Sequence, residues 1–258
     1  MKKLHIPSEN LPFTLQIDIE VTKPSIVVFR GYDPTRQNTV YFSRKFGREG
    51  KMCHGKHRLQ FPLPISPKKL VVKVFDANDP DRKDTILIKQ NGIKAIPLGK
   101  FPSIAFPSNE FMQFTFFAMW FANNAGYLRQ KAYSSGDPHN FMISYLNDIK
   151  DRNTGMSIPT PARISRVSGG IEANRKQFIG YTIPMRMLIL LHERMHFEKN
   201  TRSEFEADFN AIKIYLQLGF PKTEAIRALA GVLSDSAQNK KRVRVIMDYI
   251  YQFQFKNG

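Results

Sequence analysis

The chain contains 258 residues, of which 42% are hydrophobic and 24% are charged. This composition is typical of a soluble globular protein with one large domain or two ordinary ones. No stretch approaches the roughly 18 consecutive apolar residues of a membrane span, and a single cysteine, Cys53, excludes an intramolecular disulfide. The formal net charge of +17 favours a polyanionic neighbour, such as DNA or an acidic protein surface.

The amino-terminal residues, MKKLHIPSENLPF, contain no apolar stretch. A secretory signal requires an apolar region of about 7–15 residues, so we expect no export by a signal peptide. Together with the single cysteine, this favours a cytoplasmic protein, or a virion component assembled in a reducing compartment, that does not enter a membrane.

Residues 1–100 have the pattern of a β domain. Short segments rich in β-branched and aromatic residues are separated by turn signals such as Asp33-Pro34 and Asn78-Asp79-Pro80. This spacing predicts an antiparallel β-sandwich or barrel, and no catalytic pattern occurs in this half. The segments are LQIDIEV, SIVVFRGY, NTVYFSR, LVVKVFDA and DTILIKQN.

A basic loop, SRKFGREGKMCHGKHR, is predicted at residues 43–58. It could bind phosphates or an acidic partner, or it could be a solvated hairpin tip. Cys53, His54 and His57 lack a fourth ligand at zinc-finger spacing, which favours an ordinary loop over a metal site. The cations of the loop are Arg44, Lys45, Arg48, Lys51, Lys56 and Arg58.

Residues 101–108 have the composition of a linker, and residues 109–258 then form a mainly helical second domain. A helix capped by Ser108 or Asn109 is predicted to run to about Tyr133, with its many aromatic residues buried as the spine of that domain. A short helix is expected at FMISYLNDIK. The segment ARISRVSGGIEANRKQFIGY alternates in polarity and predicts a small hairpin that turns at Gly169-Gly170.

The segment that starts at Pro184 carries the chemistry. Its apolar helix contains the HExxH motif His192-Glu193-Arg194-Met195-His196. Residues four apart share one helical face, so both imidazoles can reach one ion. Glu193 then lies beside the ion, where it can act as a general base on a bound water.

Zinc needs a third protein ligand, and the next helix offers one. The capping-box pattern from Ser203 to Glu206 begins that helix, and Glu204 lies in its first turn. Asp208 follows four residues later on the same face, where it can orient a ligand histidine. Glu198 and Glu206 are rival ligands, but Glu206 is better explained by the capping box.

HERMH followed by EFEAD resembles the gluzincin metallopeptidases over roughly residues 160–220. The resemblance implies a zincin-like domain with His192, His196 and Glu204 as zinc ligands and Glu193 as the catalytic base. It also implies that Asp208 supports a ligand and that the hairpin supplies an edge strand for a peptide substrate. More faintly, HExxH beside EFEAD with the continuation LGFP resembles virion-associated proteins of crAss-like tailed phages.

The sequence departs from the gluzincin pattern at two points. Arg194 puts a charge between the histidines, where an uncharged residue is usual. His196 and Glu204 are only eight positions apart, which requires a tight turn. No oxyanion donor is evident, since Tyr181 and Tyr215 are only candidates and a tyrosine at such a position is more often a core residue.

A further helix is predicted after Pro221, and the last helix, NKKRVRVIMDYIYQF, has a basic start. Positive charge at a helix amino terminus is locally unfavourable, so these residues either meet a polyanion or form a solvated face. They are Lys240, Lys241, Arg242 and Arg244.

Three functions remain open. The first is a zinc metallopeptidase that hydrolyses a peptide or protein substrate. The alternative is a structural or assembly component of a phage virion, in the capsid-tail or neck region among other virion proteins, that uses the zincin-like domain as a scaffold. A sequence-specific nucleic-acid binder is weaker, because no recognition motif accompanies the net charge.

Overall fold

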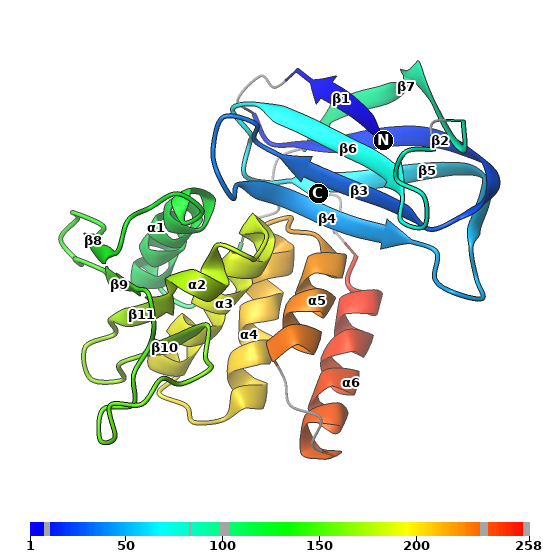
Figure 1. Cartoon of the computed structure of the whole chain (residues 1–258). Helices are drawn as coiled ribbons and strands as arrows, with labels where there is room; N and C mark the ends of the chain where they lie inside the picture. Colours follow the sequence, from blue (N-terminus) through cyan, green and yellow to red (C-terminus); the bar gives the residue numbers. More distant parts are fainter. Residues whose placement is uncertain (8–10, 83, 99–103, 233–236, 255–258) are drawn as a thin grey trace. The chain divides into compact units, whose positions relative to one another are not determined.

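The computed structural model describes residues 1–7, 11–82, 84–98, 104–232 and 237–254, with the backbone alone for residues 231, 232 and 237–240. The chain divides into two compact units, Met1–Lys100 and Phe101–Gly258 (Figure 1). It is a mixed α+β protein in which antiparallel pairing predominates. None of the described helices is both long and apolar enough to cross a bilayer.

The first unit consists of two antiparallel sheets. One has the strand order β1-β6-β3-β4 and the other β5-β2-β7. The antiparallel β architecture expected for this half is therefore confirmed. The strands are β1 (Lys2–Ile6), β2 (Phe13–Ser25), β3 (Val27–Tyr32), β4 (Val40–Phe46), β5 (Cys53–Leu63), β6 (Leu70–Asp76) and β7 (Ile86–Pro97).

Aromatic packing joins the two sheets into a sandwich. Phe61 on β5 stacks against Phe42 on β4 with ring centroids 4.3 Å apart, and it lies 5.4 Å from the ring of Phe29 on β3. All three side chains are buried. The strands form two separate sheets that pack against each other through this core, which selects the sandwich over the barrel.

The basic loop expected at residues 43–58 is largely regular structure. Strand β4 extends to Phe46 and β5 begins at Cys53, so only a short turn, closed by a bridge between Arg48 and Lys51, connects them. The alternating polar and apolar pattern of β5 was hidden by its basic residues. Cys53, His54 and His57 do not form a metal-binding group in the described part of the chain.

The second unit packs helices beside one small sheet of order β10-β11-β9-β8, in which β9 and β11 run parallel. Its strands are β8 (Lys131–Ser134), β9 (Met142–Leu146), β10 (Ala162–Ile164) and β11 (Ile171–Asn174). Its helices are α1 (Asn109–Asn124), α2 (Arg175–Phe178), α3 (Ile183–Glu198), α4 (Glu204–Gln217), α5 (Lys222–Val232) and α6 (Ala237–Gln252).

Helix α1 begins where its cap predicts. The Ser108 hydroxyl accepts a hydrogen bond from the Phe111 N–H at 3.0 Å. The helix ends earlier than expected, because residues 131–134 form β8. Its burial is also one-sided, since Phe116 and Trp120 are exposed by 59% and 46%. The predicted linker at 101–108 lies partly outside the described residues.

The short helix predicted at FMISYLNDIK is wrong, because this segment contains β9. Ile143 and Tyr145 are fully buried and alternate with the more exposed Ser144. The Tyr145 hydroxyl donates to the Ala125 carbonyl at 2.8 Å. This period of two belongs to a strand, and it was too short to distinguish from a helix by sequence.

The predicted hairpin is confirmed, with β10 as the edge strand of its sheet. Gly169 closes the turn with a φ of +68°, and a Cβ there would lie only 3.1 Å from the guanidinium of Arg194. A larger residue would thus meet both backbone strain and α3. The turn and the HExxH helix are consequently packed together.

Candidate metal centre

Helix α3 presents the two histidines on one face. Pro184 lies in its first turn, and its first nine residues are all buried. Packing therefore holds the helix in place before the HExxH motif begins. His192 and His196 are one turn apart, with ring centroids separated by 4.8 Å. Their Nε2 atoms approach to 3.2 Å.

A tight turn closes the short gap to the third ligand. Asn200 adopts a φ of +44°, and the Thr201 N–H donates to the His196 carbonyl at 3.1 Å. The Thr201 carbonyl in turn lies 3.0 Å from Nδ1 of His196. Thr201 thus ends the helix through its N–H and orients the ring of His196 through its carbonyl. The eight positions from His196 to Glu204 are therefore enough to return the chain to the two histidines.

The amino-terminal cap of α4 forms only half of the expected box. The Ser203 hydroxyl accepts from the Glu206 N–H at 3.2 Å, but the Ser203 N–H donates to the Thr201 hydroxyl instead of to Glu206. The cap still fixes Glu204 in the first turn of the helix. Glu204 therefore extends toward the face of α3.

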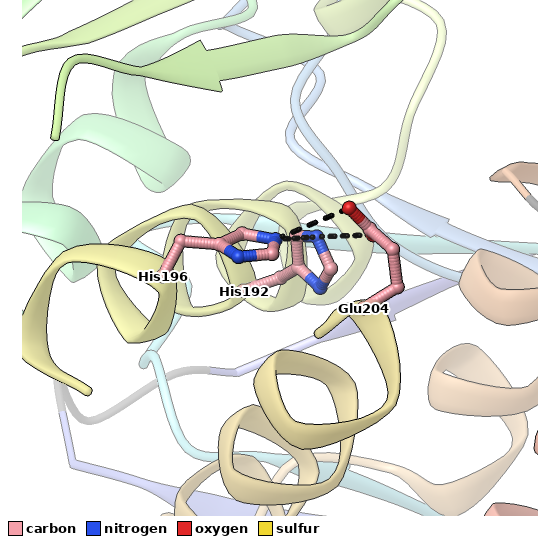
Figure 2. Close-up of side chains that lie close together, drawn as sticks. All are labelled: His192, His196 and Glu204. Atoms are coloured by element: carbon pink, nitrogen blue, oxygen red, sulfur yellow. Dashed lines mark hydrogen bonds and ion pairs between the residues drawn. The ribbon is translucent and has the colours of Figure 1, made fainter. Parts of the chain in front are cut away.

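The three side chains converge on one point (Figure 2). The Glu204 carboxylate lies 3.4 Å from Nε2 of His192 and 3.5 Å from Nε2 of His196, through different oxygens. All the ligand atoms lie within 4.8 Å of one another. In the described part of the chain, no other group of three His, Cys, Asp or Glu side chains comes together in this way.

These separations fit a single small cation. Zinc bonds to nitrogen and oxygen at about 2.0–2.1 Å, so a tetrahedral ion holds neighbouring ligand atoms roughly 3.3 Å apart. Both rings are also oriented for binding, because their Nδ1 atoms face Asp208 and the Thr201 carbonyl. This leaves both Nε2 atoms directed at the common point.

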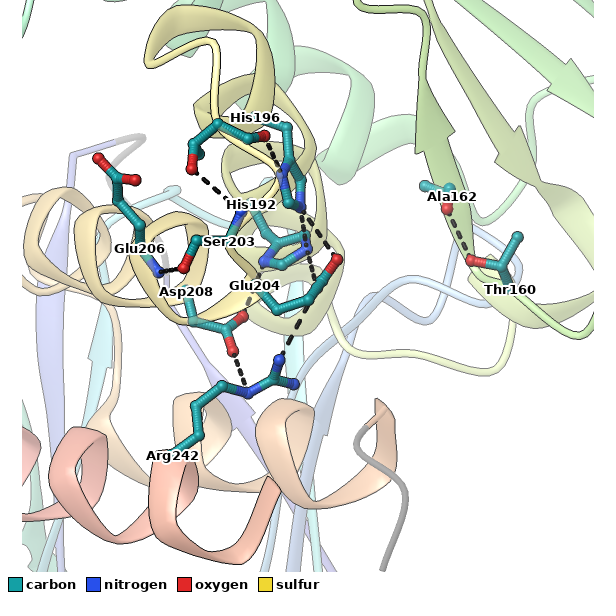
Figure 3. A network of polar contacts seen from close by, with 10 residues as sticks. Thr160, Ala162, His192, His196, Ser203, Glu204, Glu206, Asp208 and Arg242 are labelled. Atoms are coloured by element: carbon teal, nitrogen blue, oxygen red, sulfur yellow. Dashed lines mark hydrogen bonds and ion pairs between the residues drawn. The ribbon is translucent and has the colours of Figure 1, made fainter. Parts of the chain in front are cut away.

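Asp208 and Arg242 lie behind the ligands (Figure 3). Asp208 is 2.7 Å from Nδ1 of His192, although the contact is off the direction of an ideal hydrogen bond. Its second oxygen lies 3.3 Å from Nε of Arg242, whose guanidinium also comes within 4.0 Å of Glu204. Asp208 thus lies beside a candidate ligand histidine, at the position expected for it, and Arg242 on α6 is an addition that the sequence did not indicate.

The close packing of opposite charges shifts the titration of all three ligands. Burial lowers the pKa of His192, but its contacts with Asp208 and Glu204 outweigh burial and raise it to about 10. The hydrogen bond to Glu204 raises the pKa of His196. The two histidines hold the pKa of the Glu204 carboxyl far below its usual range.

Zinc binding should therefore release protons even in alkaline solution. A metal displaces the proton of a ligand imidazole, and a histidine of pKa about 10 is still protonated at pH 8. A zinc-bound water of pKa about 7 also ionises at this pH, so we expect about two protons released per zinc at pH 8, measured by calorimetry in buffers of different ionisation enthalpy. Histidines titrating near 6.5 would leave only about one proton, from the water, and that result would contradict the coupling.

Glu193 lies beside the ligand face, next to the edge strand. Burial raises its pKa, and the nearby histidines and the Ile164 N–H on β10 partly oppose that effect. A carboxylate with a raised pKa next to a cation site is a stronger proton acceptor than a free one. This position matches the role expected for the residue after the first histidine.

The rival ligands are engaged elsewhere or point away. Glu198 accepts a hydrogen bond from the Ser108 hydroxyl at 2.7 Å and lies 3.5 Å from Arg194. Glu206 is exposed to solvent. The candidate oxyanion donors are also elsewhere, since the hydroxyls of Tyr181 and Tyr215 bond to Gln177 and to the Pro221 carbonyl.

Arg194, the charged residue between the histidines, points away from them. Its side chain is 2% exposed and pairs with Glu110 on α1 and with Glu198. Its guanidinium also lies 4.6 Å from the centre of the Phe197 ring. The departure from the gluzincin pattern thus serves the packing of α1 against α3.

Replacing Arg194 with methionine should destabilise the protein without removing the metal site. The change leaves Glu198 partly buried and without its cation, which costs about 2–3 kcal/mol, below the usual cost of a fully buried broken pair. Chemical denaturation measures this loss. Zinc content should stay unchanged, and loss of zinc in a folded variant would contradict the assignment.

The site opens into a cavity of about 520 Å³. Helix α3 and the edge strand β10 form two of its walls, and Leu188, Ile189, Ala228 and Leu229 make part of it apolar. Arg163 and Arg166 add positive charge near β10. The Thr160 hydroxyl donates to the Ala162 carbonyl at 2.7 Å, which fixes the chain as it enters that strand (Figure 3).

Some of the basic residues expected to face a polyanion are paired or packed within the protein, and others are exposed. Arg58 forms two hydrogen bonds with Asp18, and Arg44 packs over the rings of Phe46 and Phe61. Arg242 is turned into the metal centre, so it is not part of a surface patch. Lys45, Arg48, Lys51, Lys56, Lys241 and Arg244 are exposed, whereas the side chain of Lys240 lies outside the described residues.

No protein-family model, curated protein or solved structure matches this chain.

Proposed function

We propose that this chain is a zinc-dependent metallopeptidase that hydrolyses peptide bonds in a peptide or protein substrate. The observation that carries the proposal is the convergence of His192, His196 and Glu204 beside Glu193. Two imidazoles and a carboxylate are a donor set that zinc favours in hydrolytic sites, where a fourth position stays free. Asp208 and Thr201 support the two rings from behind.

Zinc held by these three side chains would supply a Lewis acid that lowers the pKa of a water molecule to about 7 and polarises the scissile carbonyl. Glu193 accepts the proton of the attacking water at its carboxylate and delivers it to the departing amine. Burial raises the pKa of Glu193, which makes its carboxylate a stronger proton acceptor than a free one. The products are a carboxylate and an amine.

The substrate is expected to lie along β10. This strand is at the edge of its sheet, so its outer side can pair with an extended peptide by main-chain hydrogen bonds. It lines the cavity from Ala162 to Ile164, and the face of α3 that carries His192 and Glu193 lines the same cavity. A peptide bound there would bring its carbonyl groups past Glu193.

The test is cleavage of an unfolded protein by the zinc-loaded chain, compared with a Glu193→Gln variant. Hydrolysis by the parent chain and none by the variant is the expected pair of results. Absence of zinc from the purified parent chain after incubation with the metal would reject the proposal.

One observation favours the second candidate, a virion structural protein with the zinc site as a scaffold. Peptide hydrolysis does not require a net charge of +17, whereas packaged DNA or an acidic virion protein would be complementary to it. In that case Glu193→Gln would leave particle assembly intact while His196→Ala would disrupt it. The two functions can coexist in one chain, either in the cytoplasm or in the particle.

A further inference from the structure

The sheet β1-β6-β3-β4 carries a row of cations on its outer face. Strand pairing places Lys3 opposite Lys73, and Lys73 opposite Arg30. Directly paired residues point to the same side of a sheet, and neighbouring strands are about 4.8 Å apart. Three positive residues therefore lie at directly paired positions across the adjacent strands β1, β6 and β3. Figure 1 shows the order of these strands in the sheet.

Lys45 extends this row on β4. It pairs with Val28, two residues from Arg30 on the same face of β3. Lys3, Arg30 and Lys45 are exposed, and Lys73 is half-buried. None of the four forms an ion pair with a described residue.

The outer face contains no carboxylate in the described register. The inward positions are occupied by core residues such as Val72, Val74 and Phe29. Like charges placed directly opposite one another destabilise a sheet, so this row works against folding. The residues paired on the outer face are Lys3 and His5 on β1, Val71, Lys73 and Phe75 on β6, Val28, Arg30 and Tyr32 on β3, and Ser43 and Lys45 on β4.

The second sheet shows the usual arrangement. There Asp18 pairs with Arg58 across the strands, with hydrogen bonds of 2.8 and 3.0 Å, and Glu20 is opposite Lys56. Opposite charges are paired between β2 and β5 on that face, although both sheets belong to the same unit and the same basic chain. The uncompensated row is thus a local property and not a consequence of the overall composition.

Partly exposed aromatic rings accompany the cations. Tyr32 and Phe75 are half-buried on the same face, on either side of the row. The Lys73 ammonium lies 4.9 Å from the centre of the Tyr32 ring. Cations with neighbouring aromatic rings are the combination that binds phosphates and stacks unpaired bases.

We propose that the outer face of the β1-β6-β3-β4 sheet binds single-stranded nucleic acid without sequence preference. Lys3, Arg30, Lys45 and Lys73 contact phosphates, and Tyr32 and Phe75 stack against bases. An acidic protein would complement the charges, whereas single-stranded nucleic acid complements the charges with its phosphates and the rings with its unpaired bases. This inference is independent of the metal centre, which lies in the other unit.

The test uses the full chain and a fluorescently labelled oligothymidylate of about 20 nucleotides, followed by anisotropy. Four phosphate contacts predict a slope of log K against log salt near −2.8, from about −0.7 per contact. The double variant Arg30→Gln, Lys73→Gln should lower the slope to about −1.4 and weaken binding about 25-fold at 0.1 M salt. Its melting temperature should equal or exceed that of the parent, because the repulsion between the neighbouring cations is reduced.

The matched control is Lys89→Gln, Lys94→Gln, which removes the same charge from exposed positions on β7. It should bind within about twofold of the parent. Tyr32→Leu should weaken binding about fivefold or more without changing the salt slope. Equal losses of affinity in both double variants would show that only net charge matters and would overturn the proposal. Equal affinity for a duplex of the same length would also overturn it, and so would full competition by polyglutamate.

Discussion

Glu193→Gln should abolish peptide hydrolysis while the protein keeps its zinc. Glutamine preserves the shape of the side chain and can still accept from the Ile164 N–H, but it cannot take a proton from water. Loss of general base catalysis lowers turnover by about 10²–10⁴-fold. The measurement is single-turnover cleavage of a fluorogenic peptide mixture, with zinc counted by elemental analysis of the same sample.

The matched control for this experiment is Glu206→Gln. Glu206 is also a glutamate of the site region, but it is exposed and contributes only its backbone N–H to the Ser203 cap. This variant should retain full activity. Unchanged cleavage by the Glu193 variant would contradict the role of that carboxylate, and loss of zinc would show that it binds the metal instead.

The helices of the site were predictable because their signals are local. Pro184 and the apolar residues after it define α3, and the Ser203 cap defines the start of α4. Two weaker local patterns led to wrong predictions. The polar spacing within Met142–Leu146 spans too few residues to reveal a period of two, and the cations of β5 conceal its alternation.

The convergence of the three candidate ligands was predictable for the same reason, since four-residue spacing and a capped helix bring them together. Contacts made over long separations were not. Arg242 reaches Asp208 from α6, and Arg194 is buried against Glu110, 84 residues away. Both arginines belong to basic or polar stretches in the sequence, and only tertiary packing decides which face each one takes.

Removing zinc should destabilise the protein and remove its activity together. Zinc at 1,000 times its dissociation constant stabilises a folded site by about 4.1 kcal/mol, which corresponds to a melting temperature about 8–16 °C higher for a domain of this size. Removing zinc from the parent chain with a chelator should lower the melting temperature by this amount, and adding zinc should restore it. Differential scanning fluorimetry and elemental analysis measure both quantities.

His196→Ala should behave like the chelated parent, with one further loss. The substitution removes a ligand and also the contact between Nδ1 and the Thr201 carbonyl, so about 1 kcal/mol should be lost beyond the chelated parent. His54→Ala, a change at an exposed histidine of the first unit, should keep zinc, stability and cleavage. A parent chain that melts at the same temperature with and without chelator would contradict the site, because a metal joining two helices must stabilise their packing.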